Sequence, residues 1–494
     1  MIVRVRYAPS PTGRMHVGNF RAALYNYLFA RRHGGVFFVR IEDTDRTRMV
    51  EGGVENILRT LAAMGIRNDE GPMLDERGEV IETGSHGPYV QSARLEIYST
   101  HGEKLLNEGK AYRCFCSAER LDAMRKAQEA QKLPTGYDRH CRNLDPKDAA
   151  GRAATGEPHV VRFMMPLEGE SEVHDLVRGH VTFQNALQED FVIIKSDNYP
   201  TYHLASVIDD HLMATTHVIR GEEWLSSIPK HVQLYKAFDW NHPIFAHLPL
   251  LLNPDRTKLS KRQGDVAVED YLDAGYLPEA LLNFVALLGW NPSGEQEMYS
   301  LTELVEKFDL AQVNSAGAVF NREKLDWLNG KYFRAMSHAE FAKRARQFLM
   351  VAGHDVSHLT DEELGKLLSL EQERVKTFKE LPEAVAFLLT EDLEYSKDIL
   401  AWKKSTPGEA LTRLEGVKEF LLELDESQFD RKTLEEKLRA FIVEQEWGTG
   451  DTLWPLRVAL SGREQSPGPF EILEVLGKMK SLRRIDSAIT RLAK

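Results

Sequence analysis

The sequence predicts an α/β protein with a doubly wound parallel sheet, an inserted α+β domain and an all-α C-terminal region. Two observations predict this class. A strand pattern, a helix pattern and a second strand pattern follow one another within residues 3–41, which is a βαβ unit and implies a parallel sheet. After residue 335 the apolar residues recur at helical spacing almost to the end of the chain. A chain of 494 residues, 42% hydrophobic and 28% charged, is long enough to hold several cores.

The βαβ unit begins with residues 3–7, where valines and a tyrosine alternate with arginines as in a strand. Residues 22–30 then carry apolar side chains at helical spacing, until two glycines stop the helix at 34–35. The run at 36–41 is almost continuously apolar, as in a buried strand. Ligands of such sheets bind at the carboxyl ends of the strands, so the loops there are candidate sites.

Residues 105–195 have a different pattern and predict an insertion. They contain all three cysteines, a charged helix near 117–132 and a short strand-like piece at 159–163. The α/β pattern resumes around 190–195 and continues to about residue 262.

The C-terminal region is predicted to be helical from the signals at its helix starts. Four threonine or serine residues precede a glutamate by three positions, the pattern of a capping box: Ser337, Thr360, Thr406 and Thr433. Between Ala410 and Leu424 the apolar residues recur every three or four positions, which predicts an amphipathic helix.

Charge and composition exclude several classes of protein. The net charge of −12 argues against a general nucleic-acid coat protein, although it permits a local basic face. No apolar run approaches the ~18 residues of a membrane-spanning helix, so we expect no membrane partner. Three cysteines in so long a chain cannot form a disulfide framework, which favours a reducing, cytoplasmic compartment.

Two loops carry residues suited to a nucleotide. His16-Val17-Gly18-Asn19 lies at the start of the first predicted helix, where unpaired N–H groups bind anions. Gly18 lets a ligand approach the backbone, and His16 can donate to a phosphate or ribose oxygen. The basic loop from Lys258 through Lys261 to Arg262 follows an apolar stretch, Leu248–Leu252, which we interpret as a strand. Its cations can neutralise charge that develops at an α-phosphate. Either motif alone also fits ordinary surface residues.

Together the two loops resemble the HIGH and KMSKS signatures of the class I aminoacyl-tRNA synthetases. Asn19 replaces the second His of the first signature, and Leu259 and Arg262 replace the Met and final Ser of the second. Further segments are similar to the glutamate and glutamine group: Arg6–Gly13, Arg40–Arg46, Tyr199–Ala205, Asp209–His211 and Arg220–Trp224. Residues 336–494 resemble the all-helical anticodon-binding region of bacterial glutamyl-tRNA synthetases, where glutaminyl and eukaryotic-type relatives have β-barrels.

The resemblance implies a glutamate–tRNA ligase that acts as a monomer. ATP and L-glutamate would give glutamyl-adenylate and pyrophosphate, with Mg²⁺ on the phosphates. The glutamyl group would then pass to the 2′-hydroxyl of the terminal adenosine of glutamate tRNA. The implied parts are a Rossmann-like catalytic domain (1–104 and 196–262), an inserted acceptor-binding domain (105–195), a stem-contact or connecting domain (263–335) and an all-helical anticodon-binding region of two subdomains (336–494).

The resemblance also implies the site residues. The glutamate pocket would be formed by Arg6, Ala8, Ser10, Glu42, Tyr202 and Arg220. A planar guanidinium binds a carboxylate through two parallel hydrogen bonds, and Glu42 suits the ammonium group. The reaction loops would supply His16, Gly18, Asn19, Lys258 and Lys261, and ATP would further contact Glu223, Trp224 and Leu251. Without the resemblance, Trp224 would be expected in the core.

All three cysteines lie between 114 and 141, which is an informative clustering. Thiolates bind Zn²⁺, which prefers four ligands. The spacing of Cys114, Cys116, Tyr137 and Cys141 resembles the structural zinc site of some family members and implies Tyr137 as the fourth ligand. By residue type, His140 is the alternative fourth ligand, and three cysteines without metal are the other interpretation.

Some features leave alternatives open. Asp209-Asp210-His211 could bind a metal, although we favour structural hydrogen bonds. Arg374 matches by its context a position where family members that read only glutamate anticodons carry arginine, but an exposed helix arginine is the simpler interpretation. The last sixteen residues carry five cations against Asp486, which fits either RNA phosphate or a solvated helix face. The alternative functions are a ligase that also charges glutamine tRNA, a glutamyl-queuosine tRNA synthetase, and an inactive RNA-binding paralogue.

Overall fold

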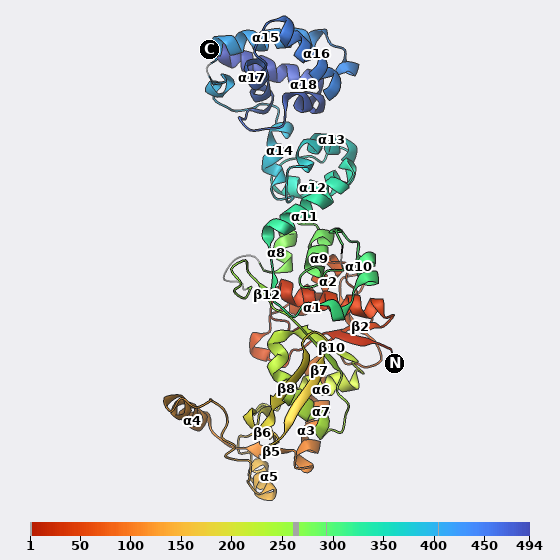
Figure 1. Cartoon of the computed structure of the whole chain (residues 1–494), viewed down its shortest axis with the longest axis vertical. Helices are drawn as coiled ribbons and strands as arrows, with labels where there is room; N and C mark the ends of the chain where they lie inside the picture. Colours follow the sequence, from red (N-terminus) through yellow and green to blue (C-terminus); the bar gives the residue numbers. More distant parts are fainter. Residues whose placement is uncertain (1, 260–265, 293, 404) are drawn as a thin grey trace. The chain divides into compact units, whose positions relative to one another are not determined.

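The computed structural model describes residues 2–259, 266–292, 294–403 and 405–494, except for the side chain of Arg46 (Figure 1). They form two compact units. The first comprises Met1–Leu272 and Pro278–Arg322, and the second comprises Asp273–Leu277 and Glu323–Lys494. Within the described part, no helix combines the length and the apolar composition needed to cross a membrane.

The first unit opens with the expected βαβ unit. Strand β1 (Arg4–Tyr7) pairs in parallel with β2 (Val36–Val39), with Arg4 opposite Val36 and Tyr7 opposite Val39. Helix α1 (Val17–Arg32) connects them and buries Phe20, Leu24 and Leu28. The periodicity of the sequence therefore predicted these three elements correctly.

A second set of strands lies beside β1. Strand β10 (His217–Gly221) pairs in parallel with β11 (Ile244–Leu248), and β11 pairs in parallel with β7 (Glu170–Asp175). Thr216, just before β10, donates its N–H to the carbonyl of Arg4, which brings β10 next to β1. The β7 strand also forms an antiparallel hairpin with β8 (Gly179–Gln184). This hairpin lies within the predicted insertion, yet it joins the sheet of β10 and β11.

Helices and a hairpin surround these strands. They are α2 (Gly53–Ala63), the hairpin of β3 (Gly71–Leu74) and β4 (Val80–Thr83), α3 (Leu95–Asn107), α6 (Tyr202–Leu212) and α7 (Ile228–Ala237). One core cluster joins α3, α6 and α7, with side chains such as Tyr98, Leu204 and Leu234 almost fully buried.

The rest of the predicted insertion is a small α+β arrangement. An antiparallel sheet contains β5 (Ala111–Cys114), β6 (Val160–Phe163) and β9 (Val192–Ile194) in that order. Two helices accompany it, α4 (Ala118–Ala130) and α5 (Pro146–Ala154). The expected helix near 117–132 and strand at 159–163 are therefore present.

The apolar stretch Leu248–Leu252 is not one strand, and that prediction was wrong. Pro249 has no N–H to give to a ladder, so β11 ends at Leu248. The chain then forms β12 (Leu251–Leu252), which pairs in parallel with β13 (Ala318–Val319). Three helices complete this part: α8 (Val268–Asp273), α9 (Pro278–Ala286) and α10 (Leu301–Lys307).

The C-terminal part is built of helices, as predicted, and Figure 1 draws them in green to blue. They are α11 (Arg322–Ala335), α12 (His338–Val351), α13 (Asp361–Gln372), α14 (Leu381–Leu389), α15 (Pro407–Glu423), α16 (Arg431–Glu444), α17 (Thr449–Ser461) and α18 (Pro469–Leu492). The amphipathic pattern of α15 is confirmed, because Leu414, Val417 and Leu421 are buried.

Three of the four predicted helix starts are present. Thr360 and Thr406 form complete capping boxes, and Ser337 accepts the N–H of Glu340. The fourth prediction was wrong, because Asp430 caps α16 by accepting the N–H of Thr433 at 3.0 Å. Asp430 is a good N-cap residue that stands three positions earlier, so Thr433 lies inside the helix.

The cations at the end of the chain stabilise the fold itself. Arg484 is buried and donates to the carbonyls of Leu460, Phe387 and Thr390. Arg491 likewise donates to the carbonyl of Leu393 at 2.6 Å. These carbonyls lie at or beyond helix ends, where backbone acceptors lack partners. Neither a free basic face nor an RNA contact is needed to explain these two arginines.

Candidate active site

A cavity of about 600 Å³ lies at the carboxyl ends of the parallel strands β1 and β10. Open parallel sheets bind their ligands at this edge. The lining includes most of the residues predicted to bind glutamate or ATP: Arg6, Ala8, Ser10, Asn19, Glu42, Tyr202, Arg220, Glu223 and Trp224. His16, Gly18, Leu251 and Lys258 are not part of this lining. Lys261 falls within 260–265, outside the described residues.

Arg6 is a buried cation at the end of β1. Its Nε and Nη2 donate to the two carboxylate oxygens of Asp210, at 2.9 and 3.3 Å. Burial raises the pKa of Asp210, but the charges of Arg6 and Arg40 outweigh burial and lower this pKa to about 2. The ionised carboxylate therefore holds the guanidinium of Arg6 in one orientation at the wall of the cavity.

Arg40 links two acidic residues behind the cavity. It is fully buried and donates to Asp210 Oδ1 at 2.7 Å and to Glu42 Oε1 at 2.9 Å. Burial raises the pKa of Glu42 in spite of the guanidinium of Arg40. A cationic ligand beside Glu42 would favour the ionised carboxylate. Sequence reasoning gave Arg40 no role, because its partners Asp210 and Ser206 lie 170 and 166 residues away.

Asp209 and Asp210 are occupied by structural hydrogen bonds. Asp209 accepts from Arg94 Nε at 2.7 Å and from Tyr98 at 2.8 Å. The ring of His211 instead stacks on Trp240, with the ring centroids 3.8 Å apart. This arrangement supports the structural interpretation of the Asp-Asp-His segment.

Arg220, at the end of β10, is a second fixed guanidinium. Its Nη1 donates to the hydroxyl of Tyr202 at 3.0 Å, and its Nη2 donates to the carbonyl of Trp224 at 3.3 Å. The rings of Tyr202 and Trp224 lie 4.2 Å apart between centroids. Trp224 is 37% exposed, so it borders the cavity and is not a core residue.

The first signature loop caps α1. Nδ1 of His16 accepts the N–H of Gly18 at 2.9 Å, which places the proton of a neutral imidazole on Nε2. A side chain at position 18 would bring a Cβ to 3.1 Å from this nitrogen, which is why glycine suits the turn. Asn19, the next residue, reaches the cavity.

Backbone hydrogen bonds join the first signature loop to residues 266–268, which follow the basic loop. Val17 donates its N–H to the carbonyl of Val266, and Val268 donates its N–H to the carbonyl of Met15, both at 2.8 Å. Glu269 strengthens this junction, because its carboxylate accepts the N–H of Met15 and the side-chain amide of Asn56 at 2.7 Å. The segment that follows the basic loop is therefore tied to the start of α1.

Leu251 precedes the basic loop, and Lys258 is the first residue of this loop. Lys258 is exposed and forms an isolated bridge with Leu252. Leu251 is 5% exposed, and its carbonyl accepts the N–H of Leu259 at 2.9 Å. These contacts fix the chain where it enters the basic loop.

Several cavity residues were missed by sequence reasoning. Thr44, Asp45, Arg48 and Lys195 line the same cavity. Lys195 reaches it from the end of the insertion, and its Nζ donates to the carbonyl of Thr44 at 3.3 Å. Thr44 and Asp45 belong to a segment that sequence comparison had marked, whereas nothing in the sequence pattern marks Lys195.

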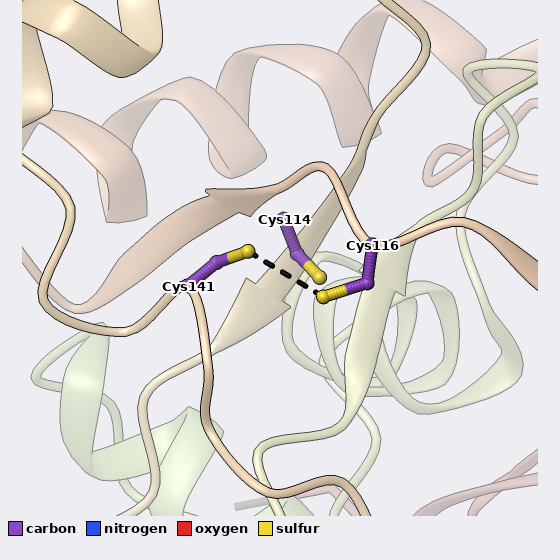
Figure 2. Close-up of side chains that lie close together, drawn as sticks. All are labelled: Cys114, Cys116 and Cys141. Carbon is purple, nitrogen blue, oxygen red and sulfur yellow. Dashed lines mark hydrogen bonds between the residues drawn. The ribbon is translucent and has the colours of Figure 1, made fainter. Parts of the chain in front are cut away.

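The three cysteines form a cluster at the edge of the small sheet. Figure 2 shows the sulfur atoms of Cys114, Cys116 and Cys141 turned toward one another, and all lie within 4.8 Å of each other. The Sγ atoms of Cys116 and Cys141 are 3.6 Å apart. The hydroxyl of Tyr137 is 3.2 Å from Cys114 Sγ and 3.6 Å from Cys116 Sγ.

This donor set fits a zinc ion. Donors at about 2.3 Å from a tetrahedral centre lie about 3.8 Å from one another, close to the observed separations. Tyr137 supplies a fourth atom from within the cluster, whereas His140 is exposed and has no ring nitrogen among the clustered ligand atoms. The arrangement therefore favours Tyr137 over His140 as the fourth donor.

Arg374 follows α13 in the second unit. Its side chain is 50% exposed, and its Nε lies 3.6 Å from Glu371 Oε2. The guanidinium is accessible to a ligand from solvent.

Comparison with known proteins identifies two families along the chain. Residues 2–327 match the catalytic domain of class I tRNA synthetases (E and Q), and residues 340–489 match an anticodon-binding domain. Curated proteins named glutamate–tRNA ligase are similar over almost the whole chain. The protein of Dehalococcoides mccartyi strain BAV1 is 48% identical and that of Clostridium botulinum strain Hall is 44% identical, each over 99% of this chain and 98% of the relative.

Solved structures agree with this result. The crystal structure of a glutamate tRNA ligase from Elizabethkingia meningosepticum, in complex with its amino acid, has a TM-score of 0.89 and 35% identity and covers 100% of both chains. The glutamate-tRNA synthetase of Elizabethkingia anophelis has a TM-score of 0.86 and 34% identity, covering 99% of this chain and 100% of that one.

Proposed function

The chain belongs to the class I tRNA synthetases of the glutamate and glutamine group and acts as a glutamate–tRNA ligase, and from this premise we propose how its residues perform the reaction. The cavity at the ends of β1 and β10 binds L-glutamate. The observation that carries this assignment is that two buried guanidinium groups and one buried carboxylate line a single cavity. Glutamate carries the complementary set, two carboxylates and one ammonium.

Arg6 and Arg220 bind the two carboxylates of glutamate. Both guanidinium groups are already oriented, Arg6 by Asp210 and Arg220 by Tyr202, so little side-chain entropy is lost on binding. Glu42 binds the ammonium group, which offsets the burial of its carboxylate. Ala8 and Ser10 complete the pocket wall.

The nucleotide occupies the side of the cavity near Trp224 and Glu223. A glutamate carboxylate oxygen attacks the α-phosphorus of ATP, a new P–O bond forms, and the bond to pyrophosphate breaks. This step needs positioning and charge neutralisation, not a protein nucleophile. His16 and Asn19 at the start of α1 contact the phosphates or ribose, and Lys258 and Lys261 neutralise the developing charge.

Magnesium is expected to arrive with ATP. Among the residues that the structure describes, the cysteine triad is the one group of His, Cys, Asp or Glu ligands close enough to hold a metal, and Mg²⁺ prefers oxygen ligands. Mg²⁺ bound to the phosphates would neutralise part of their charge.

Zinc is proposed for the cysteine cluster. Cys114, Cys116, Cys141 and Tyr137 would hold it, and it would fasten the end of β5 to the loop around 137–141. Its role would be structural, because a fully ligated ion has no open position for a substrate.

The other parts of the chain bind tRNA. Residues 105–195 approach the acceptor end of the tRNA, and residues 336–494 bind its anticodon. Residues 263–335 form the stem-contact or connecting domain between the catalytic domain and the anticodon-binding region. Two packed groups of helices, α12–α14 and α15–α18, support two subdomains in this last region. Arg374 reads an anticodon base edge. We propose that the enzyme acts as a monomer. We also propose that it lies in the cytoplasm, because three unpaired cysteines fit a reducing compartment.

Charging of purified tRNA tests this function. The enzyme is incubated with labelled glutamate, ATP and Mg²⁺ and with transcripts of glutamate tRNA or glutamine tRNA. Transfer to glutamate tRNA alone is expected. Transfer to both transcripts would still support a glutamate-transferring ligase, but it would contradict the proposed anticodon-reading role of Arg374. No transfer to either by folded enzyme would contradict the proposal.

A further inference from the structure

Behind the cavity, a buried histidine and a buried aspartate support Arg220. Nε of Arg220 donates to Nε2 of His247 at 3.0 Å, and Nδ1 of His247 lies 2.6 Å from Asp175 Oδ2. His247 and Asp175 are both fully buried, and neither lines the cavity. The three residues come from the neighbouring strands β10, β11 and β7.

The chemistry of the two partners fixes the tautomer of His247. A guanidinium can only donate hydrogen bonds, and an ionised carboxylate can only accept them. His247 must therefore carry its proton on Nδ1, toward Asp175, and present the lone pair of Nε2 to Arg220. Burial lowers the pKa of His247, although the carboxylate of Asp175 acts to raise it. The lowered pKa keeps the ring neutral.

Asp175 is itself held by the backbone. Its Oδ1 accepts the N–H groups of Val177 and Arg178, each at 2.9 Å, and the N–H of His247 is shared between Oδ1 at 3.2 Å and Oδ2 at 3.1 Å. Oδ1 is thus held by Val177 and Arg178, and Oδ2 is the atom that faces the imidazole. The carboxylate is thus a fixed acceptor in a dry environment.

We propose that Asp175 and His247 are positioning residues that hold Arg220 in the orientation that binds a carboxylate of glutamate. With Nε engaged from behind, the terminal nitrogens Nη1 and Nη2 face Tyr202, the carbonyl of Trp224 and the cavity. This inference rests on the proposed role of Arg220 and adds two residues that do not touch the substrate. Strand β7 carries Asp175 into the sheet, where it pairs with Phe245 of β11.

Asp175→Asn tests the chain of hydrogen bonds with almost no change in volume. The backbone N–H groups of Val177 and Arg178 require an oxygen at the Oδ1 position, so the amide NH₂ must face His247. Because that NH₂ donates, Nδ1 of the imidazole would have to accept, and the imidazole proton would move to Nε2. There it would face the N–H of Arg220 Nε, and the hydrogen bond between His247 and Arg220 would be lost. The KM for glutamate is expected to rise about tenfold or more, while the KM for ATP changes little.

Ser171→Ala is the matched control. Ser171 is fully buried on the same face of β7, and it donates to Asn185 at 2.6 Å, away from His247. This variant loses two buried hydrogen bonds, because Ser171 Oγ also accepts from Gln233 Nε2 at 2.8 Å. It is expected to melt at a lower temperature with an unchanged KM for glutamate. An equal rise of KM in both variants would mean that Asp175 acts only through the stability of β7.

Substitution of His247 gives a second measurement. The amide oxygen of His247→Gln can accept from Arg220 Nε, whereas His247→Leu offers no acceptor. The KM for glutamate is expected to rise less in the glutamine variant than in the leucine variant. Nitrogen-15 spectra of histidine-labelled enzyme are expected to show His247 as the Nδ1–H tautomer, assigned by its absence in His247→Gln. The Nε2–H tautomer in the wild-type enzyme would overturn the inference.

Arg220→Lys separates this inference from the proposed function. If it leaves the KM for glutamate unchanged, the role of Arg220 in binding is wrong. If it raises the KM while Asp175→Asn and His247→Leu do not, Arg220 binds glutamate without help from the pair, and only the positioning inference is wrong.

Discussion

At the scale of single residues, Arg6 and Arg220 show how a buried charged side chain is held in one orientation. Each guanidinium is buried, and each is held by partners from other elements. A buried charge requires such partners, because its desolvation would otherwise be costly. The same partners restrict its orientation. If these arginines bind glutamate as proposed, stability and substrate specificity depend on the same hydrogen bonds.

Arg6→Lys is expected to raise the KM for glutamate about tenfold or more, because a lysine cannot bind a carboxylate through two parallel N–H groups. Steady-state aminoacylation at varied glutamate concentration measures the effect. Arg4→Lys is the matched control, since Arg4 lies on the same strand but pairs with Glu70 at 2.9 and 2.8 Å, outside the cavity lining. Similar KM values for both variants would contradict the role of Arg6.

The lowered pKa of Asp210 predicts that the folded protein loses stability in acid. Its pKa is lowered from 3.8 to about 2 in the folded protein, so the ionised group stabilises the fold above about pH 4. This contribution, about 2 kcal/mol, is lost as the pH falls through about 2. Denaturant unfolding from pH 5 to pH 2 measures it. At pH 5 the Asp210→Asn variant is expected to have a lower free energy of unfolding than the wild type. Between pH 5 and pH 2 this free energy is expected to fall less in the variant. An equal fall in both proteins would contradict the stabilising role of ionised Asp210.

At the scale of elements, the cysteine cluster joins the end of a strand to a loop that follows it in the sequence. Cys114 ends β5, whereas Tyr137 and Cys141 lie in a loop between α4 and α5. Among the described residues of α4, none is buried, and the core of this region is the small cluster of Tyr112, Cys114, Tyr137 and Cys141. A metal ion is a common substitute for a core in such small regions.

Elemental analysis of the purified protein is expected to find one zinc ion per chain. Cys141→Ser is expected to lose the metal and to lower the melting temperature by several degrees. Tyr137→Phe tests the fourth ligand and is expected to weaken zinc retention against a chelator, while His140→Ala retains it as the wild type does. Weaker retention in His140→Ala alone would reverse the assignment of the fourth ligand.

Glu269 of helix α8 holds the chain just before the first signature loop. Its carboxylate accepts from Met15, Asn56 and Thr60, so it joins the start of α1 to α2. Glu269→Gln is expected to raise the KM for ATP about tenfold and to leave the KM for glutamate nearly unchanged. Pyrophosphate exchange in the presence of tRNA, at varied ATP concentration, measures this. A rise only in the KM for glutamate would contradict the proposed nucleotide side of the cavity.

At the scale of the whole molecule, the sequence predicted local features better than distant ones. The βαβ unit and the C-terminal helices were predictable, because their apolar periodicity and caps are encoded within short segments. Both local errors have local causes: Pro249 interrupts an apolar run, and Asp430 precedes Thr433 as a better cap.

The supports of the site were not predictable in this way. Arg6 and Asp210 are 204 residues apart in the sequence, and Asp175 and His247 are 72 residues apart. Neither pair leaves a periodic signal, because the fold alone brings them together. The resemblance to a known family supplied the residues that we propose face the substrate, but it did not supply the buried residues behind them.

The central claim is that the cavity at the ends of β1 and β10 binds glutamate, and a crystal structure with L-glutamate tests it most directly. The account predicts one carboxylate within hydrogen-bond distance of Arg6, the other near Arg220, and the ammonium group beside Glu42. Glutamate bound elsewhere, or bound in this cavity without contact to either arginine, would contradict it.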